Sequence, residues 1–128
     1  METHETYVSL ETAKLLKRAG FDWECSHIYY CYKEDNNTWQ LEPNCKNNDR
    51  ISQLDYVLRA PALSVAQKWL REVKRCCIFC TPTTRTKWCF TLMCPDTRIL
   101  EHAKDYKTYE EALEYGIQKC LTDLLKGK

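Results

Sequence analysis

The sequence contains little glycine or proline, no long apolar run and almost no excess of charge of either sign. Three glycines and four prolines in 128 residues exclude collagen-like, low-complexity and linker-like chains. No run approaches the roughly 18 apolar residues that a membrane-spanning helix needs. A net charge of +1 argues against a general-purpose nucleic-acid-binding protein, which is usually strongly basic. The apolar fraction of 44% is too high for a disordered chain, so we expect one folded domain over residues 1–128.

The N-terminal residues 1–6 also lack the basic and apolar segments of a secretory signal. We therefore expect a protein of the cytoplasm, where thiols stay reduced. Nine cysteines suit this compartment, because an odd number fits poorly with a closed disulfide framework. We interpret them as free thiols that pack as small hydrophobic side chains.

Three segments have the apolar spacing of amphipathic helices. The first follows Ser9, a suitable N-cap, and ends at Gly20, which favours the left-handed turn after a helix. The second begins at Pro61, and its apolar stripe comprises Ala62, Val65, Ala66, Trp69, Leu70 and Val73. The third follows Thr108, whose spacing to Glu111 forms a capping box.

Strands are indicated by β-branched and aromatic residues over 26–32, 38–41, 76–81, 88–93 and 98–103. Residues 51–58 are ambiguous between a strand and a helical turn, and the connection 81–87 suits a hairpin. The strands come in antiparallel-compatible pairs rather than in alternating βαβ units. We therefore predict an α+β fold in the order α-β-(β)-α-β-β-(β)-α, with three helices on one face of an antiparallel sheet.

The neutral total charge conceals an uneven distribution. Residues 1–58 hold 6 basic and 10 acidic side chains, residues 59–98 hold 8 and 2, and residues 99–128 hold 5 and 6. The basic middle segment combines cations on the second helix and in the hairpin with a tryptophan that can stack on a ligand. We predict that an anionic ligand binds at Lys68, Arg71, Arg75, Arg85, Lys87 and Trp88. The alternative is an ordinary solvated helix face, which most amphipathic helices have.

The cysteine spacing superficially resembles a four-thiolate zinc site. Cys77 and Cys80 form one close pair, and Cys89 and Cys94 form a second. In a strand, however, Cys77 points to the face opposite Cys76 and Cys80, so this pair cannot converge on one ion. We therefore expect neither a metal ion nor another cofactor.

Signals of catalysis are weak. His27 and His102 are candidate partners for a cysteine nucleophile, but no glycine-rich elbow or familiar flanking motif accompanies them. No Walker-type loop and no G-x-G-x-x-G motif is present. A lone histidine on a strand is more often structural than catalytic, so we expect a protein that is not an enzyme.

Three segments together resemble one group of known proteins. They are Tyr7–Leu16 with Gly20 and Phe21, then Ala66–Val73, then Tyr109–Ala112. In these segments the chain is similar to small accessory proteins of Bacteroides-type gut phages and prophages, and residues 69–72 are the most specific part. The resemblance covers most of the chain outside residues 33–58. It implies a phage protein that acts in the cytoplasm of a bacterial host, and it supplies no activity and no site residue.

Small phage proteins often counter host defence by sequestering a nucleotide signal or by binding a defence protein. Together with the basic segment, this context predicts a non-enzymatic, homo-oligomeric protein that binds an anionic nucleotide-derived ligand. One alternative is a module that docks on a host defence protein through exposed aromatic residues. The other is a weak nucleic-acid-binding protein that uses the basic helix, whereas a membrane is not an expected partner.

Overall fold

The computed structural model describes residues 6–31, 38–43, 56–94, 99–101 and 105–126. Within these ranges the chain forms α1 (Leu10–Ala19), β1 (His27–Cys31), β2 (Gln40–Pro43), β3 (Tyr56–Arg59), α3 (Leu63–Val73), β4 (Cys77–Thr84), β5 (Lys87–Met93), β6 (Ile99–Glu101) and α4 (Tyr109–Lys126). The predicted α+β class and element order are confirmed. None of the helices in these ranges combines the length and the apolar character required for crossing a membrane.

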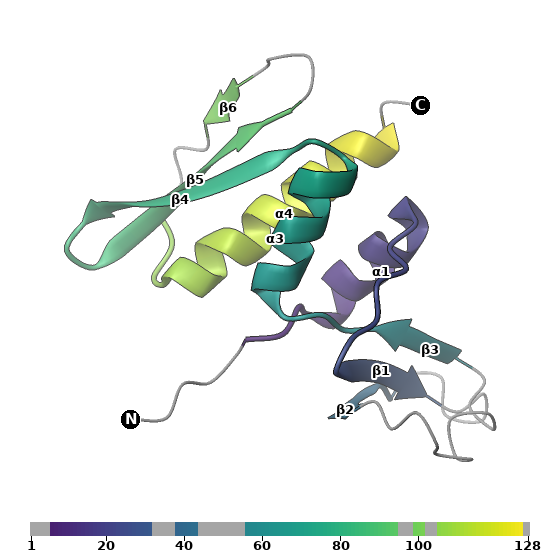
Figure 1. Cartoon of the computed structure of the whole chain (residues 1–128). Coiled ribbons are helices and arrows are strands. Elements are labelled where there is room, and N and C mark those ends of the chain that lie inside the picture. Colours follow the sequence, from purple (N-terminus) through teal and green to yellow (C-terminus); the bar gives the residue numbers. More distant parts are fainter. Residues whose placement is uncertain (1–5, 32–37, 44–55, 95–98, 102–104, 127–128) are drawn as a thin grey trace.

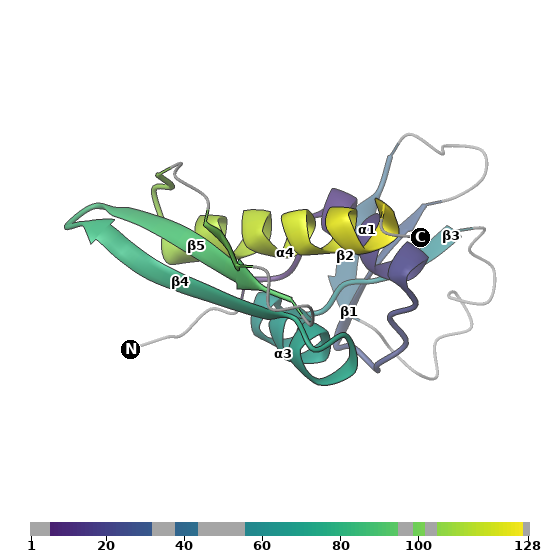
Figure 2. The same cartoon turned by 90° about the horizontal axis from the view of Figure 1, so that it is seen from above.

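The strands form two antiparallel sheets, in the orders β2-β1-β3 and β4-β5-β6. Figures 1 and 2 show the two sheets on opposite sides of the helices, which lie between them. The single sheet of the sequence prediction is therefore divided. Strand β3 comes from the segment that was ambiguous in the sequence, and it pairs with β1. Helix α3 then follows β3 and precedes the β4–β5 hairpin, so the later strands form a sheet of their own.

Both predicted caps of α1 are confirmed. The Ser9 hydroxyl accepts a hydrogen bond from the Thr12 amide. At the other end Gly20 has φ +96°, a left-handed conformation that glycine adopts without a steric penalty. This turn sends the chain back along the helix, and the Phe21 amide donates to the Leu16 carbonyl oxygen over 2.9 Å.

The second helix, α3, begins two residues later than predicted. Ala62 is its N-cap and has extended backbone angles, because it forms a bridge with Tyr7. The carbonyl oxygen of Pro61 accepts from the Val8 amide over 3.0 Å, so Pro61 belongs to the strand-like connection before the helix. The predicted apolar stripe is buried except at Val65, which is partly buried, and at its end, where Val73 is 49% exposed.

Helix α4 packs closely against the β4–β5 hairpin. Its capping residue is confirmed, since the Thr108 hydroxyl accepts from the Glu111 amide over 3.0 Å. Gly116 faces the hairpin, and a Cβ atom built there would lie 2.8 Å from Ile78 and 3.1 Å from Phe90. One hydrophobic cluster joins all three helices to both sheets; its largest members include Leu16, Leu58, Trp69, Leu70, Phe90, Leu92, Ile117 and Leu121.

Candidate ligand-binding pocket

The residues predicted to bind an anion fall into two groups. Lys68 and Arg71 are exposed on α3. Arg75 does not lie on the helix as predicted: it follows the C-cap residue Lys74 in a left-handed conformation with φ +61°. Lys68 is also within 3.8 Å of the carboxylate of Glu72.

The second group lies far along the hairpin. Arg85 and Lys87 are exposed at the turn between β4 and β5. Trp88 is only partly exposed, because its ring meets Tyr109 edge-on at a centroid distance of 5.4 Å. It therefore contributes to the contact between the hairpin and α4.

The length of β4 separates the two groups. Next to Lys68, the Gln67 side chain donates to the carbonyl oxygen of Ile78 over 2.8 Å. The hairpin turn after Thr84 is about 20 Å further along the strand at the usual rise per residue. A single small ligand cannot touch both groups, so the structure does not bring the predicted six residues together.

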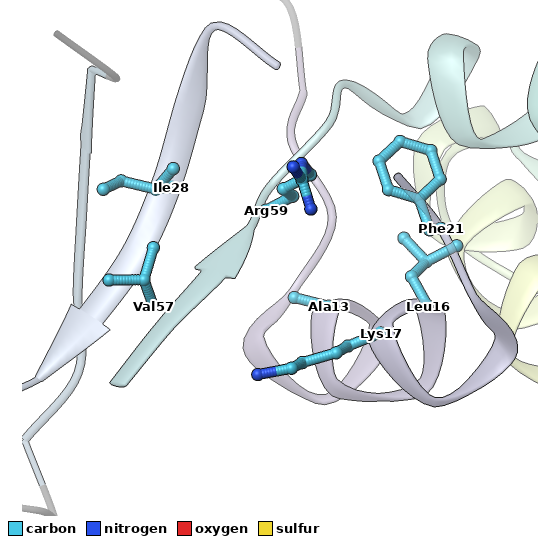
Figure 3. A pocket seen from close by; sticks show the side chains of 7 residues that line it. All are labelled: Ala13, Leu16, Lys17, Phe21, Ile28, Val57 and Arg59. Carbon is cyan, nitrogen blue, oxygen red and sulfur yellow. The ribbon is translucent and has the colours of Figure 1, made fainter. Parts of the chain in front are cut away.

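A pocket that the sequence did not indicate lies between α1 and the first sheet. Its volume is about 300 Å³, and its lining consists of Ala13, Leu16, Lys17, Phe21, Ile28, Val57 and Arg59. Figure 3 shows Ile28 and Val57 on the sheet side and Ala13 and Leu16 on the helix side. Arg59 lies between these two walls, and Lys17 extends along α1 with its ammonium group toward the sheet. The pocket therefore combines an apolar lining with two cationic side chains.

The helix side of the pocket is built by local sequence signals. Ala13, Leu16 and Lys17 lie three and four positions apart, which places them on one face of α1. The left-handed turn at Gly20 then returns Phe21 to the end of this face. The ring of Phe21 is buried and meets the Trp69 ring edge-on at 5.2 Å, so α3 holds this wall in place.

The sheet side of the pocket is built by the pairing of β1 with β3. Ile28 lies opposite Arg59 in this antiparallel pair. Val57 and Arg59 share one face of β3 because side chains alternate along a strand, and Leu58 points to the other side, where it is buried. The register thus sets a guanidinium group beside two apolar side chains.

Both cations of the pocket are unneutralised within the part of the chain that the structure describes, where no carboxylate lies within 4 Å of either. Other cations behave differently. Lys119 pairs with Asp123 over 3.3 Å, and the ammonium groups of Lys14 and Lys74 lie over the rings of Trp39 and Trp69. Lys17 and Arg59 are therefore available to an anion.

Cys25 lies near Arg59 but is not activated by it. Burial raises the pKa of the Cys25 thiol to about 11, although the positive charge of Arg59 opposes the shift. At neutral pH the thiol is protonated, and a protonated thiol is a poor nucleophile. His27 contacts the ring of Tyr7 and the hydroxyl of Ser26 instead, while His102 lies outside the described residues. The pocket thus places two cationic side chains near a thiol that is protonated at neutral pH.

The predicted role of the cysteines as packed thiols is confirmed for several of them. Cys31, Cys76 and Cys120 are buried, and every cysteine in the described ranges is a free thiol. Cys77 pairs with the exposed Met93, and Cys80 pairs with the buried Phe90, so the two thiols point to opposite faces of β4 as expected. This pair cannot hold one ion.

No protein-family model, curated protein or solved structure matches this chain.

Proposed function

We propose that the chain is a non-enzymatic binding protein that holds a small anionic, nucleotide-derived ligand in the pocket between α1 and β3. The observation that carries the proposal is a pair of cations, Lys17 and Arg59, that line one apolar pocket and have no ion pair within the described residues. They come from different elements, so the fold, and not a basic stretch of sequence, places both in this pocket.

The two cations suit a phosphate group. A guanidinium group can donate two parallel hydrogen bonds to phosphate oxygens, and an ammonium group adds a point charge. Hydrogen bonds to charged groups contribute about 1.5–3 kcal/mol each, and the exposure of both cations places these contacts near the lower end of that range because water screens them.

The apolar lining suits the rest of such a ligand. Val57 is partly exposed and can contact a planar base, and the nearly fully buried Leu16, Phe21 and Ile28 make the rest of the apolar lining. A volume of about 300 Å³ is at the lower end of the range for small-molecule sites. The pocket therefore favours a mononucleotide-sized ligand over an extended oligonucleotide, which would need a longer groove.

A binding pocket without an activated nucleophile suits sequestration. In the phage context that the resemblance implies, such a protein would lower the free concentration of a signalling nucleotide in the host. The proposal predicts tight, stoichiometric binding of the intact ligand without turnover.

A thermal-shift screen tests this proposal. The probes are cyclic mononucleotides, cyclic dinucleotides and ADP-ribose, with inorganic phosphate as a reference for the charge alone. The wild-type chain should be stabilised by at least one nucleotide beyond the effect of phosphate, because ligands that bind the folded state raise its stability.

A pair of matched double variants locates the effect. Lys17→Gln with Arg59→Gln should abolish the shift, whereas Lys68→Gln with Arg71→Gln removes the same charge from α3 and should leave it intact. A chain that no probe stabilises, or a loss confined to the α3 variant, contradicts the proposal.

A second candidate function, docking on another protein, is favoured by one surface. Phe79 and Met93 are 49% and 39% exposed, and both lie on the face of the β4–β5 hairpin that points away from α4. Exposed apolar patches commonly mark interaction sites. If docking is the function, Phe79→Ser with Met93→Ser should abolish capture of a defined host protein, and the Lys17 and Arg59 variant should not.

A further inference from the structure

Three cysteine thiols that are distant in sequence converge at one point of the fold. The Sγ atoms of Cys76, Cys94 and Cys120 all lie within 4.8 Å of one another, and those of Cys76 and Cys94 are 3.5 Å apart. Cys76 and Cys120 are fully buried, and Cys94 is partly exposed. The cluster is thus a buried group of three soft ligand atoms with access from one side.

Three different elements place these thiols. The pairing of Cys77 with Met93 sets Cys76 and Cys94 opposite each other where the hairpin begins and ends. Arg75, in its left-handed conformation, turns the chain after α3 so that the Cys76 amide donates to the Leu70 carbonyl oxygen over 3.0 Å. Helix α4 passes over this end of the hairpin and brings Cys120 against the other two thiols (Figure 1).

We propose that Cys76, Cys94 and Cys120 form a binding site for one thiophilic divalent metal ion of the zinc type, held by three thiolates. Thiolate ligands select soft or borderline ions such as Zn²⁺. A tetrahedral site with Zn–S bonds of about 2.3 Å has its sulfur atoms roughly 3.8 Å apart. The sulfur atoms of Cys76 and Cys94 are 3.5 Å apart and no separation exceeds 4.8 Å, so small side-chain movements close the site. A fourth position remains for a water molecule, as in other zinc sites with three protein ligands.

A divalent ion fits the charge of the site better than a monovalent one. Three thiolates and Zn²⁺ leave one negative charge, whereas three thiolates and Cu⁺ leave two, and burying charge costs free energy. Because the metal ion binds thiolates and not thiols, its affinity should rise with pH.

The site is tested with the full chain, purified under reducing conditions without chelator and then titrated with Co²⁺ and Zn²⁺. One Co²⁺ per chain should produce thiolate-to-cobalt charge-transfer absorption together with the intense visible bands of tetrahedral cobalt. One equivalent of Zn²⁺ should abolish both signals. Metal binding should also raise the melting temperature and protect the partly exposed Cys94 from alkylation.

Two variants separate the site from general effects of cysteine loss. Cys94→Ala removes the partly exposed ligand, which puts the core least at risk, and should lower the affinity for Co²⁺ by at least tenfold while circular dichroism stays unchanged. Cys77→Ala removes the sequence neighbour of Cys76 on the opposite face of β4 and should leave the affinity intact. Absence of stoichiometric binding, equal binding by Cys94→Ala, or a Cys76–Cys94 disulfide in the reduced preparation would overturn the proposal.

Discussion

Arg59 lies directly opposite Ile28 in the antiparallel pair of β1 and β3, and both residues line one pocket against α1. A cation beside an apolar side chain can contact two unlike parts of one ligand. The cation can bind a charged group, and the apolar side chain can contact a planar or aliphatic group. Lys17 extends from α1 and Arg59 from β3, so the helix and the sheet each contribute one positive charge to the pocket.

The first prediction concerns the chemistry of Arg59. Arg59→Lys keeps the charge but loses the paired donors of the guanidinium group, so it should lower the affinity for the nucleotide with the largest thermal shift by about tenfold. Arg59→Gln should lower it further. Titration calorimetry measures both effects, and Arg18→Gln, an exposed change next to Lys17 on α1, serves as the control. Equal affinities for wild type and Arg59→Gln would exclude this residue from the site.

The second prediction concerns the close contact of α4 with the hairpin. An alanine normally stabilises a helix by about 1 kcal/mol relative to glycine, but the Cβ atom of Gly116→Ala would meet Ile78 at 2.8 Å. We expect the free energy of unfolding to fall by about 1–3 kcal/mol, measured by chemical denaturation. Lys119→Ala, an exposed change in the same helix, should stay within about 0.5 kcal/mol of wild type. A stabilised Gly116→Ala protein would show that α4 does not pack so closely.

The third prediction concerns the turn at Arg75, which directly precedes the buried Cys76. Arg75 adopts φ +61°, a conformation that costs a non-glycine residue roughly 1–2 kcal/mol. Arg75→Gly should relieve this cost and raise the free energy of unfolding by about 0.5–1 kcal/mol, after the larger entropy of the unfolded glycine chain is deducted. Arg71→Gly, inside α3, should lower it by about 1 kcal/mol. Opposite signs for the two variants support the turn, and equal destabilisation rules it out.

The fourth prediction concerns the pH dependence of stability. Glu114 accepts hydrogen bonds from the Ser9 amide and the Thr12 hydroxyl, yet burial raises its pKa above the ordinary value of 4.5. A carboxyl group with a raised pKa in the folded state favours folding when it is protonated. Its contribution is therefore present below pH 4.5 and is lost as the pH rises through the folded-state pKa.

Denaturation curves between pH 4 and pH 8 test this sign. Glu114→Gln keeps an acceptor for the Ser9 amide and removes the titration, so its stability should change less with pH over the range just above 4.5. If wild type and variant follow parallel curves, Glu114 does not titrate as its burial implies.

Local signals explain which elements the sequence could reveal. The caps at Ser9, Gly20 and Thr108 are set by hydrogen bonds within a few residues, and all three are found where they were predicted. Strand β3 is short, and its segment carries no clear alternation, so only its pairing with β1 identifies it. The division into two sheets depends in the same way on pairings between distant segments, which no local pattern encodes.

The candidate sites show the same distinction. Lys68 and Trp88 are close in sequence, but the extended β4 carries Trp88 away from α3. Lys17 and Arg59 are distant in sequence and line the same pocket because β3 packs beside α1. Cys120 reaches Cys76 only because α4 crosses the end of the hairpin. Clusters of charge or of cysteine along the chain are therefore poor guides to clusters in space.

Amide chemical-shift mapping shows directly whether an anionic nucleotide binds between α1 and β3. The isotopically labelled chain is titrated with the nucleotide that stabilises it most, and inorganic phosphate is titrated in parallel. We expect the largest shifts at Lys17, Phe21, Ile28 and Arg59, saturating at one ligand per chain, with the hairpin turn at Arg85 unchanged. Shifts concentrated at Lys68, Arg71 or Arg85, with the pocket residues unmoved, would contradict the account.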